Sequence, residues 1–303
     1  MPVCPPALRP GANVAVLAPA SPPRSSDEYE KGLAHLRRLY DVQMVWAPGA
    51  ERGYLSAPDA ARASALHHAM KAPTVRAIFC VRGGYGTLRL LDRVRWSLAR
   101  RHPTLLVGYS DITALQLALY ARAGWTSLSG PVVTEWGRAD TKTIEHFRGL
   151  AEGHRLLQAD SLTPLSDGCA QGPLLGGNLS VLSRLVGTPY APSFRGSILC
   201  LEDVAEAPYR VDRMLAHLKH AGILRVVNGV VLGHFSTEPK RSSPTLSLQE
   251  VFADYFADRP YPVATGLSYG HLLPRKTLPL GAPVSLEARR GDGQLRSLAP
   301  VVR

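Results

Sequence analysis

Residues 104–120 have the sequence TLLVGYSDITALQLALY, and this segment indicates the class of fold. The apolar run over 104–108 predicts a short buried strand, and the pattern over 112–122 predicts a helix. Only the tight turn GYSD separates the two. A serine in such a turn is exposed at the carboxyl edge of a sheet, in front of a helix N-terminus whose N–H groups are unpaired. Ser110 is therefore a candidate functional residue.

The alternation of strand and helix extends through the first half of the chain. Ser25 and Glu28 have the spacing of a capping box at a helix start, and Pro58 suits the first position of another helix. Strands are predicted at 13–18, 42–47, 75–81, 104–108 and 125–129. Strands separated by helices favour right-handed crossovers and a parallel sheet. Residues 1–150 are thus predicted to form a parallel-sheet α/β/α domain.

The second half is richer in strands and less regular. Periodicity fades over residues 149–172, so residues 151–170 are interpreted as a linker and 171–303 as a mixed α+β domain. A helix is expected over 208–224, with Val211, Met214, Leu215 and Leu218 on one face. A further helix is predicted at 179–186, and strands at 197–201, 226–232, 262–266, 284–288 and 294–298. The fold class expected for the whole chain is α/β, with a second, strand-rich domain.

Composition excludes several classes of function. The net charge of the 303 residues is +11, but the arginines are spread along the chain rather than gathered on one element, which argues against nucleic-acid binding. No window approaches the roughly 18 apolar residues that cross a bilayer. The N-terminus has no secretory pattern, so a cytoplasmic protein without a membrane partner is expected. Four scattered cysteines and the absence of HExxH indicate no metal centre, and no cofactor is predicted.

The turn around Ser110 has a chemical and a structural interpretation. A nucleophile elbow also places its serine between a strand and a helix, and the N–H of the next residue holds an oxyanion. The G-x-S-x-G pattern is only half present, because Ile112 stands where the second glycine would be. Ser110 or Asp111 could instead cap the helix.

Three other segments carry candidate residues. FCVRGGYGTLRLLD (79–92) contains a glycine loop after a strand, whose N–H groups could bind an oxyanion or a phosphate. SILCLEDVAEAPYRVDRML (197–215) puts Glu202 at the end of a strand, as an orienting carboxylate or a charge at a helix start. GLSYGHLLPRKTLPLG (266–281) has His271 in a loop, where a histidine is commonly just solvated.

Together these segments resemble the LD-carboxypeptidase family of serine peptidases, which includes muramoyltetrapeptide carboxypeptidase and the microcin C immunity peptidase. The resemblance runs from RPGANVAVLAPASP through RGGYGTLRLLD and GYSDITAL to GPLLGGNLSVLSRLVGTPY, LEDVAEAPYRVDRML and GHLLPRKTLPLGAPVSL. It implies a catalytic triad of Ser110, Glu202 and His271. It also implies oxyanion donors at the backbone N–H groups of Asp111 and Gly84.

The resemblance implies a metal-free serine carboxypeptidase that hydrolyses an L,D-peptide bond. Its expected substrate is a small murein tetrapeptide, from which terminal D-alanine is released during cell-wall recycling. A homodimer is expected. Two alternatives stay open: an immunity-type peptidase that cleaves peptidyl or aminoacyl nucleotides, and a non-enzymatic module that binds phosphate or sugar with its GGYG loop.

Overall fold

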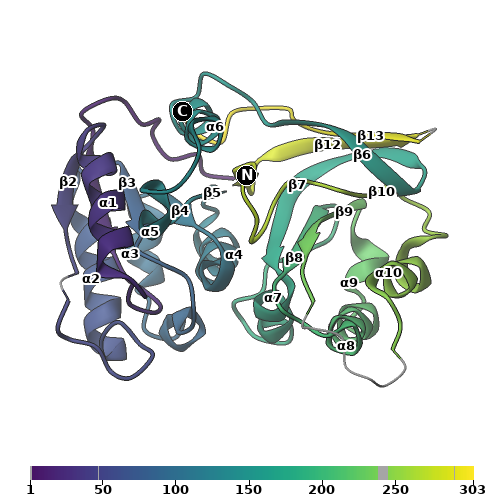
Figure 1. Cartoon of the computed structure of the whole chain (residues 1–303), viewed down its shortest axis with the longest axis horizontal. Coiled ribbons are helices and arrows are strands. Elements are labelled where there is room, and N and C mark those ends of the chain that lie inside the picture. Colours follow the sequence, from purple (N-terminus) through teal and green to yellow (C-terminus); the bar gives the residue numbers. More distant parts are fainter. Residues whose placement is uncertain (1, 47, 238–244, 290) are drawn as a thin grey trace.

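A mostly parallel sheet forms the core of the first half of the protein in this computed structural model, which describes residues 2–46, 48–237, 245–289 and 291–303 (Figure 1). The strand order is β11-β5-β4-β3-β1-β2. All neighbours pair in parallel except β11, which runs antiparallel to β5. The strands are β1 (Asn13–Leu17), β2 (Asp41–Met44), β3 (Ala77–Cys80), β4 (Leu105–Gly108), β5 (Ser127–Ser129) and β11 (Leu278–Leu280).

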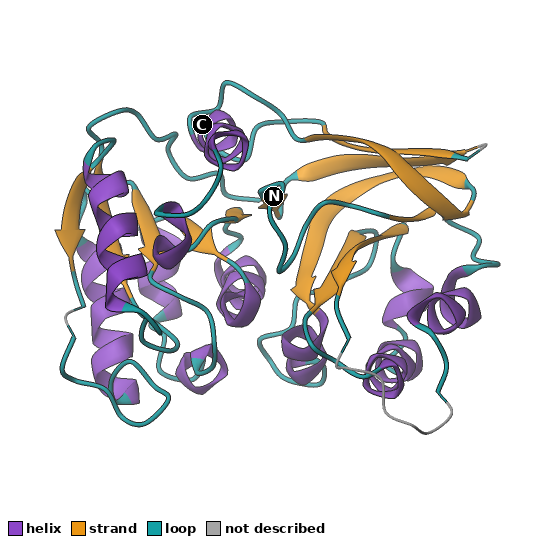
Figure 2. Cartoon of the chain, in the orientation of Figure 1, coloured by secondary structure: helices purple, strands orange, loops and turns teal. Residues whose placement is uncertain are grey.

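Helices cover both faces of this sheet. α1 packs against α5, whereas α3 packs against α2 and α4. These helices are α1 (Ser26–Arg37), α2 (Asp59–Lys71), α3 (Trp96–Arg101), α4 (Thr113–Ala123), α5 (Val133–Trp136) and α6 (Thr141–Ala151), with 3-10 turns at Thr87–Leu90 and Ser110–Ile112. The predicted parallel-sheet α/β/α architecture is therefore confirmed (Figure 2). The side chain of Ser25 also accepts the N–H of Glu28, as the capping-box spacing predicts.

The second half forms a closed barrel with the strand order β10-β6-β13-β12-β7-β8-β9. Its strands are β6 (Gln158–Ser166), β7 (Gly168–Asn178), β8 (Ile198–Asp203), β9 (Gly229–Phe235), β10 (Val263–Thr265), β12 (Pro283–Arg289) and β13 (Asp292–Ser297). Helices α7 (Leu179–Leu185), α8 (Pro208–His220), α9 (Ile223–Val226) and α10 (Leu248–Phe256) lie together below the barrel strands in Figure 1. The predicted apolar face of α8 is buried, which confirms the predicted helix face.

Two parts of this half differ from the sequence prediction. The segment 151–170, predicted to be a linker, contains β6 and the start of β7. Its residues look polar because one face of β6 points to solvent, while Ala159 and Leu162 are buried in the barrel. The strand predicted at 226–232 begins only at Gly229, because the preceding residues form α9. The domain boundaries at residues 150 and 171 stay a prediction.

The chain crosses between the two halves more than once. After β10 of the barrel, a loop over residues 266–277 leads to β11, which pairs with β5 of the first sheet. The N–H of Ala7 also donates to the carbonyl of Arg303, at 2.8 Å, so the two ends of the chain lie side by side. The loop that carries His271 therefore runs along the junction of sheet and barrel. In the described part of the chain, every helix is too short or too polar to traverse a bilayer.

Candidate active site

Ser110 lies directly after β4, at the carboxyl edge of the parallel sheet. Its φ of 64° is in the left-handed region, which a residue with a Cβ seldom adopts. A side chain on Gly83 would lie 2.9 Å from the Cβ of Ser110, so the absence of a side chain there lets the glycine loop approach the serine. The strained turn thus presents the Ser110 hydroxyl beside the loop that follows β3, as a nucleophile elbow does.

Asp111 connects this turn to the glycine loop. Its carboxylate accepts the N–H of Thr87 at 2.8 Å, and its carbonyl accepts the Thr87 hydroxyl at 2.5 Å. Burial raises the pKa of the Asp111 carboxyl. From the other side, the buried guanidinium of Arg62 donates to the carbonyl of Gly86 at 3.0 Å. The loop is therefore fixed by partners on two sides.

The glycine loop and the serine turn each leave an amide N–H free. Among the described residues, the N–H groups of Gly84 and Asp111 donate to no protein acceptor. Gly84 has a φ of 97°, a conformation that favours glycine. An oxyanion site requires unpaired amides near the attacking hydroxyl. Asp111 follows Ser110 directly, and Gly84 follows Gly83, on which a Cβ would lie 2.9 Å from the Cβ of Ser110.

His271 meets both other candidate side chains. Its Nε2 lies 3.1 Å from the Ser110 hydroxyl oxygen, and its Nδ1 lies 2.8 Å from Oε2 of Glu202. Because an ionised carboxylate only accepts, Nδ1 carries the proton and Nε2 is left to accept from the serine. The structure therefore brings together Ser110, His271 and Glu202, which lie far apart in the sequence.

Glu202 is fully buried at the end of β8. Gly270 allows the histidine loop to reach it, since a Cβ there would lie 2.7 Å from Oε2. The second carboxylate oxygen accepts the side-chain amide of Asn178 at 3.2 Å, and the same amide donates to Asp203 at 2.9 Å. Hydrogen bonds to both oxygens fix the plane of the carboxylate and so the ring that it holds.

Asn178 was not among the residues selected from the sequence. It ends β7 and is paired in register with Glu202 on β8. Its own backbone N–H donates to the Thr113 hydroxyl at 3.1 Å, which joins the barrel to α4. The signal available in the sequence was LLGGN, an apolar run that ends in two glycines and a polar residue. That pattern does not identify Asn178 as a site residue until the strand that pairs with β7 is known.

A buried ion pair forms a second connection between the halves, and it was also not predicted. Arg275 pairs with Glu135 of α5, and Glu135 accepts the Tyr109 hydroxyl at 2.7 Å. The guanidinium of Arg275 stacks on the Tyr109 ring, 3.7 Å from its centroid, and donates to the carbonyl of Gly270 at 3.3 Å. The Tyr109 ring also contacts the His271 ring, with the two ring centroids 5.0 Å apart. This cluster, which we call the Arg275 clasp, supports the histidine loop.

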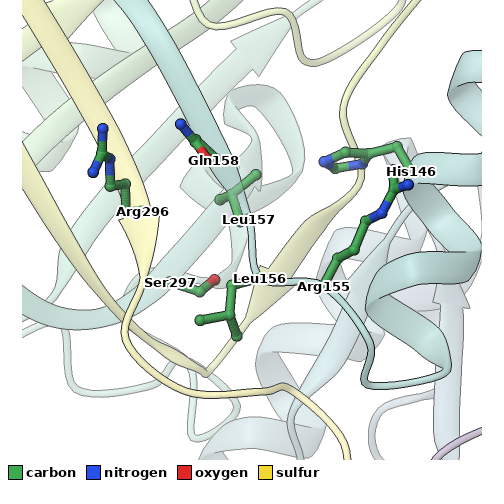
Figure 3. Close-up of a pocket in the computed structure, with 7 residues that line it drawn as sticks. All are labelled: His146, Arg155, Leu156, Leu157, Gln158, Arg296 and Ser297. Carbon is green, nitrogen blue, oxygen red and sulfur yellow. The ribbon is translucent and has the colours of Figure 1, made fainter.

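A pocket of about 450 Å³ lies away from these residues (Figure 3). His146, Arg155 and Arg296 are among its lining residues, and none of the five candidates predicted from the sequence is. The described residues contain no cluster of three or more His, Cys, Asp or Glu side chains suited to a metal ion. The hydroxyl of Ser110, the imidazole of His271 and the carboxylate of Glu202 form a chain of hydrogen bonds that can perform acyl transfer.

Comparison with known proteins finds two domain models and a full-length relative that match this chain. A model of the LD-carboxypeptidase N-terminal domain matches residues 14–130, and one of the LD-carboxypeptidase C-terminal domain matches residues 171–286. The murein tetrapeptide carboxypeptidase of Pseudomonas aeruginosa is 34% identical over 292 residues, which cover 91% of this chain and 94% of that protein.

Solved structures share the fold. The crystal structure of muramoyltetrapeptide carboxypeptidase from Oxalobacter formigenes has a TM-score of 0.85 and 31% identity, and the match covers 94% of this chain and 98% of that one. The microcin C7 self-immunity protein MccF, in complex with aspartyl sulfamoyl adenosine, has a TM-score of 0.89 and 20% identity over 100% of both chains. At that identity, the second likeness concerns the fold alone.

Proposed function

Because this chain belongs to the LD-carboxypeptidase family, whose members are serine-type hydrolases, we propose how its residues divide the work. Ser110 is the nucleophile, His271 the general base, and Glu202 the carboxylate that orients the histidine. The observation that carries this proposal is the pair of hydrogen bonds from Ser110 to His271, at 3.1 Å, and from His271 to Glu202, at 2.8 Å. If Ser110 only capped a helix and His271 were only a solvated loop residue, nothing would require their side chains to align with Glu202.

The reaction is acyl transfer in two steps. Nε2 of His271 takes the hydroxyl proton as the oxygen of Ser110 attacks the scissile carbonyl carbon. The N–H groups of Gly84 and Asp111 receive the resulting oxyanion, each contributing about 3–4 kcal/mol by comparison with other oxyanion sites. His271 then protonates the leaving amine as the C–N bond breaks. Water, deprotonated by the same imidazole, hydrolyses the ester and frees Ser110.

The proposed substrate is a murein tetrapeptide, which loses its terminal D-alanine in cell-wall recycling. The relatives named murein and muramoyltetrapeptide carboxypeptidase support this choice, as does the net charge of +11, since such peptides carry several carboxylates. A cytoplasmic location and a homodimer accompany the proposal. Light scattering of the purified protein would test the dimer.

Mass spectrometry of a murein tetrapeptide incubated with the protein tests the function. We expect release of D-alanine, no cleavage of the all-L peptide, and full activity in EDTA. Ser110→Ala should abolish the release while the protein stays folded. Turnover by that variant, or activity that is lost in chelator and restored by zinc, would refute the mechanism.

The immunity-type activity is separated from this function by a second substrate. MccF, solved with aspartyl sulfamoyl adenosine, shares the fold. Faster hydrolysis of an aminoacyl sulfamoyl adenosine than of the tetrapeptide would assign this chain to that activity instead.

A further inference from the structure

An open pocket of about 430 Å³ adjoins the candidate active site on the side of the glycine loop. It is lined by Arg24, Arg82, Tyr54 and Tyr85, and it reaches Gly84, whose N–H is a proposed oxyanion donor. The rings of Tyr54 and Tyr85 are exposed and meet edge to face with their centroids 5.4 Å apart. The pocket thus has one aromatic wall and one cationic wall.

Arg82 lines this pocket next to the glycine loop. It directly precedes Gly83 and Gly84, and its Cζ is 3.5 Å from the position that a Cβ on Gly84 would occupy. The neighbouring Gly83 lies so close to Ser110 that a Cβ on it would be 2.9 Å from the Cβ of Ser110. One Arg82 nitrogen donates to the carbonyl of Pro22 at 3.1 Å, which fixes the guanidinium while most of its N–H groups remain available.

Arg82 and Arg24 have no acidic partner among the described residues. Burial, and then the neighbouring charge of Arg24, lowers the pKa of Arg82, so the two cations disfavour each other. The other arginines near the site are already paired: Arg62 with Asp59, and Arg275 with Glu135. Arg24 and Arg82 therefore bring positive charge without an acidic partner to the glycine-loop pocket.

A carboxypeptidase must bind the free carboxylate next to the bond that it cleaves. One residue spans at most about 3.6 Å, so this carboxylate lies a few Å from the carbonyl whose oxygen occupies the oxyanion site. A half-buried guanidinium presents paired N–H donors whose geometry matches the two oxygens of a carboxylate. It therefore binds a carboxylate more strongly than an exposed cation does.

We propose that Arg82, assisted by Arg24, binds the C-terminal carboxylate of the substrate and so makes the enzyme an exopeptidase. This inference rests on the proposed function, because it assigns the leaving amino acid to the side of the glycine loop. The ligand class is a peptide with a free terminal carboxylate, and a C-terminal amide is its uncharged counterpart.

Binding is measured in Ser110→Ala protein, so that no hydrolysis intervenes. Isothermal titration calorimetry compares the tetrapeptide acid with its C-terminal amide. We expect the acid to bind at least about 10-fold more tightly, the value of a charge-assisted hydrogen bond. Adding Arg82→Gln should remove this preference, and Arg24→Gln should reduce it. Arg76→Gln is the matched control, since Arg76 is exposed at the opposite end of β3 and should leave the preference unchanged.

The outcomes separate the two proposals. An acid preference that survives Arg82→Gln would overturn the carboxylate site, even if the wild-type protein releases D-alanine. Failure of Ser110→Ala protein to bind either peptide, or equal affinity for both, would also overturn it. A third outcome is that wild-type protein does not cleave the tetrapeptide but still prefers the acid through Arg82. That result would refute the proposed reaction, while the carboxylate site at Arg82 would stand.

Discussion

Replacing Arg275 by methionine should weaken both the fold and the activity, because the Arg275 clasp joins the two halves of the protein. Arg275 and Glu135 are 4% and 5% exposed, so the variant removes the buried cation of this carboxylate and leaves it, among the described residues, only the exposed Arg138, at 3.9 Å. Breaking a buried pair in this way costs about 3–5 kcal/mol. The hydroxyl of Tyr109 still donates to Glu135, which places the expected loss at the lower end, about 3 kcal/mol.

The same variant should lower kcat/KM. It removes the hydrogen bond to the Gly270 carbonyl and the cation over the Tyr109 ring, which itself contacts His271. A displacement of about 1 Å in a catalytic group can cost about 100-fold in rate. We therefore expect a fall of about 100-fold in tetrapeptide hydrolysis at a temperature where the variant is still folded.

The free energy of unfolding is measured by urea titration, with tryptophan fluorescence as the signal. Buried Trp136 of α5 is a probe next to Glu135. A double variant, Arg275→Met with Glu135→Leu, should be more stable than the sum of the single losses predicts, because no buried charge is then left unpaired. The control is Asp160→Asn, which breaks an exposed pair with Arg296 and should cost less than about 1 kcal/mol. A loss below about 1 kcal/mol in Arg275→Met, with unchanged kcat/KM, would refute the role of the clasp.

Three further predictions follow from other residues. Ser110→Gly should abolish activity yet raise the free energy of unfolding by about 1 kcal/mol, because glycine relieves the positive φ of 64°; a loss of stability in urea unfolding would contradict this. Glu202→Gln should lower kcat by about 10⁴-fold, since the amide no longer enforces the tautomer of His271; steady-state kinetics near wild type would exclude the proposed role. Burial, followed by the charges of Lys276 and Arg155, lowers the pKa of His146 from 6.5 to about 4. The unfolded state then binds more protons between those values, so stability should fall by on the order of 2 kcal/mol as the pH drops from 6.5 to 4. Unfolding midpoints across this range should show a shallower fall in His146→Gln, and an identical fall would rule out His146 as the cause.

Local patterns in the sequence were sufficient for much of the fold. The strand, turn and helix over residues 104–122, the helix N-cap at Ser25 and the buried face of α8 each depend on residues that are near one another in the sequence. Such patterns state which face of an element is buried. The identity of Ser110, Glu202 and His271 as candidates came from the order of motifs along the chain, not from any one motif.

Tertiary structure alone decided which faces meet. The segment of β6 resembles a linker in its sequence because half of its side chains face solvent, and its place in the barrel depends on β10 and β13, which lie far along the sequence. Asn178 and the Arg275 clasp were missed for the same reason: Glu202 lies 24 residues from Asn178, and Glu135 lies 140 residues from Arg275. Hydrophobic periodicity indicates which residues of an element are buried, but not which other element they pack against. The alignment of Ser110 with His271 therefore exists only once sheet and barrel have packed together.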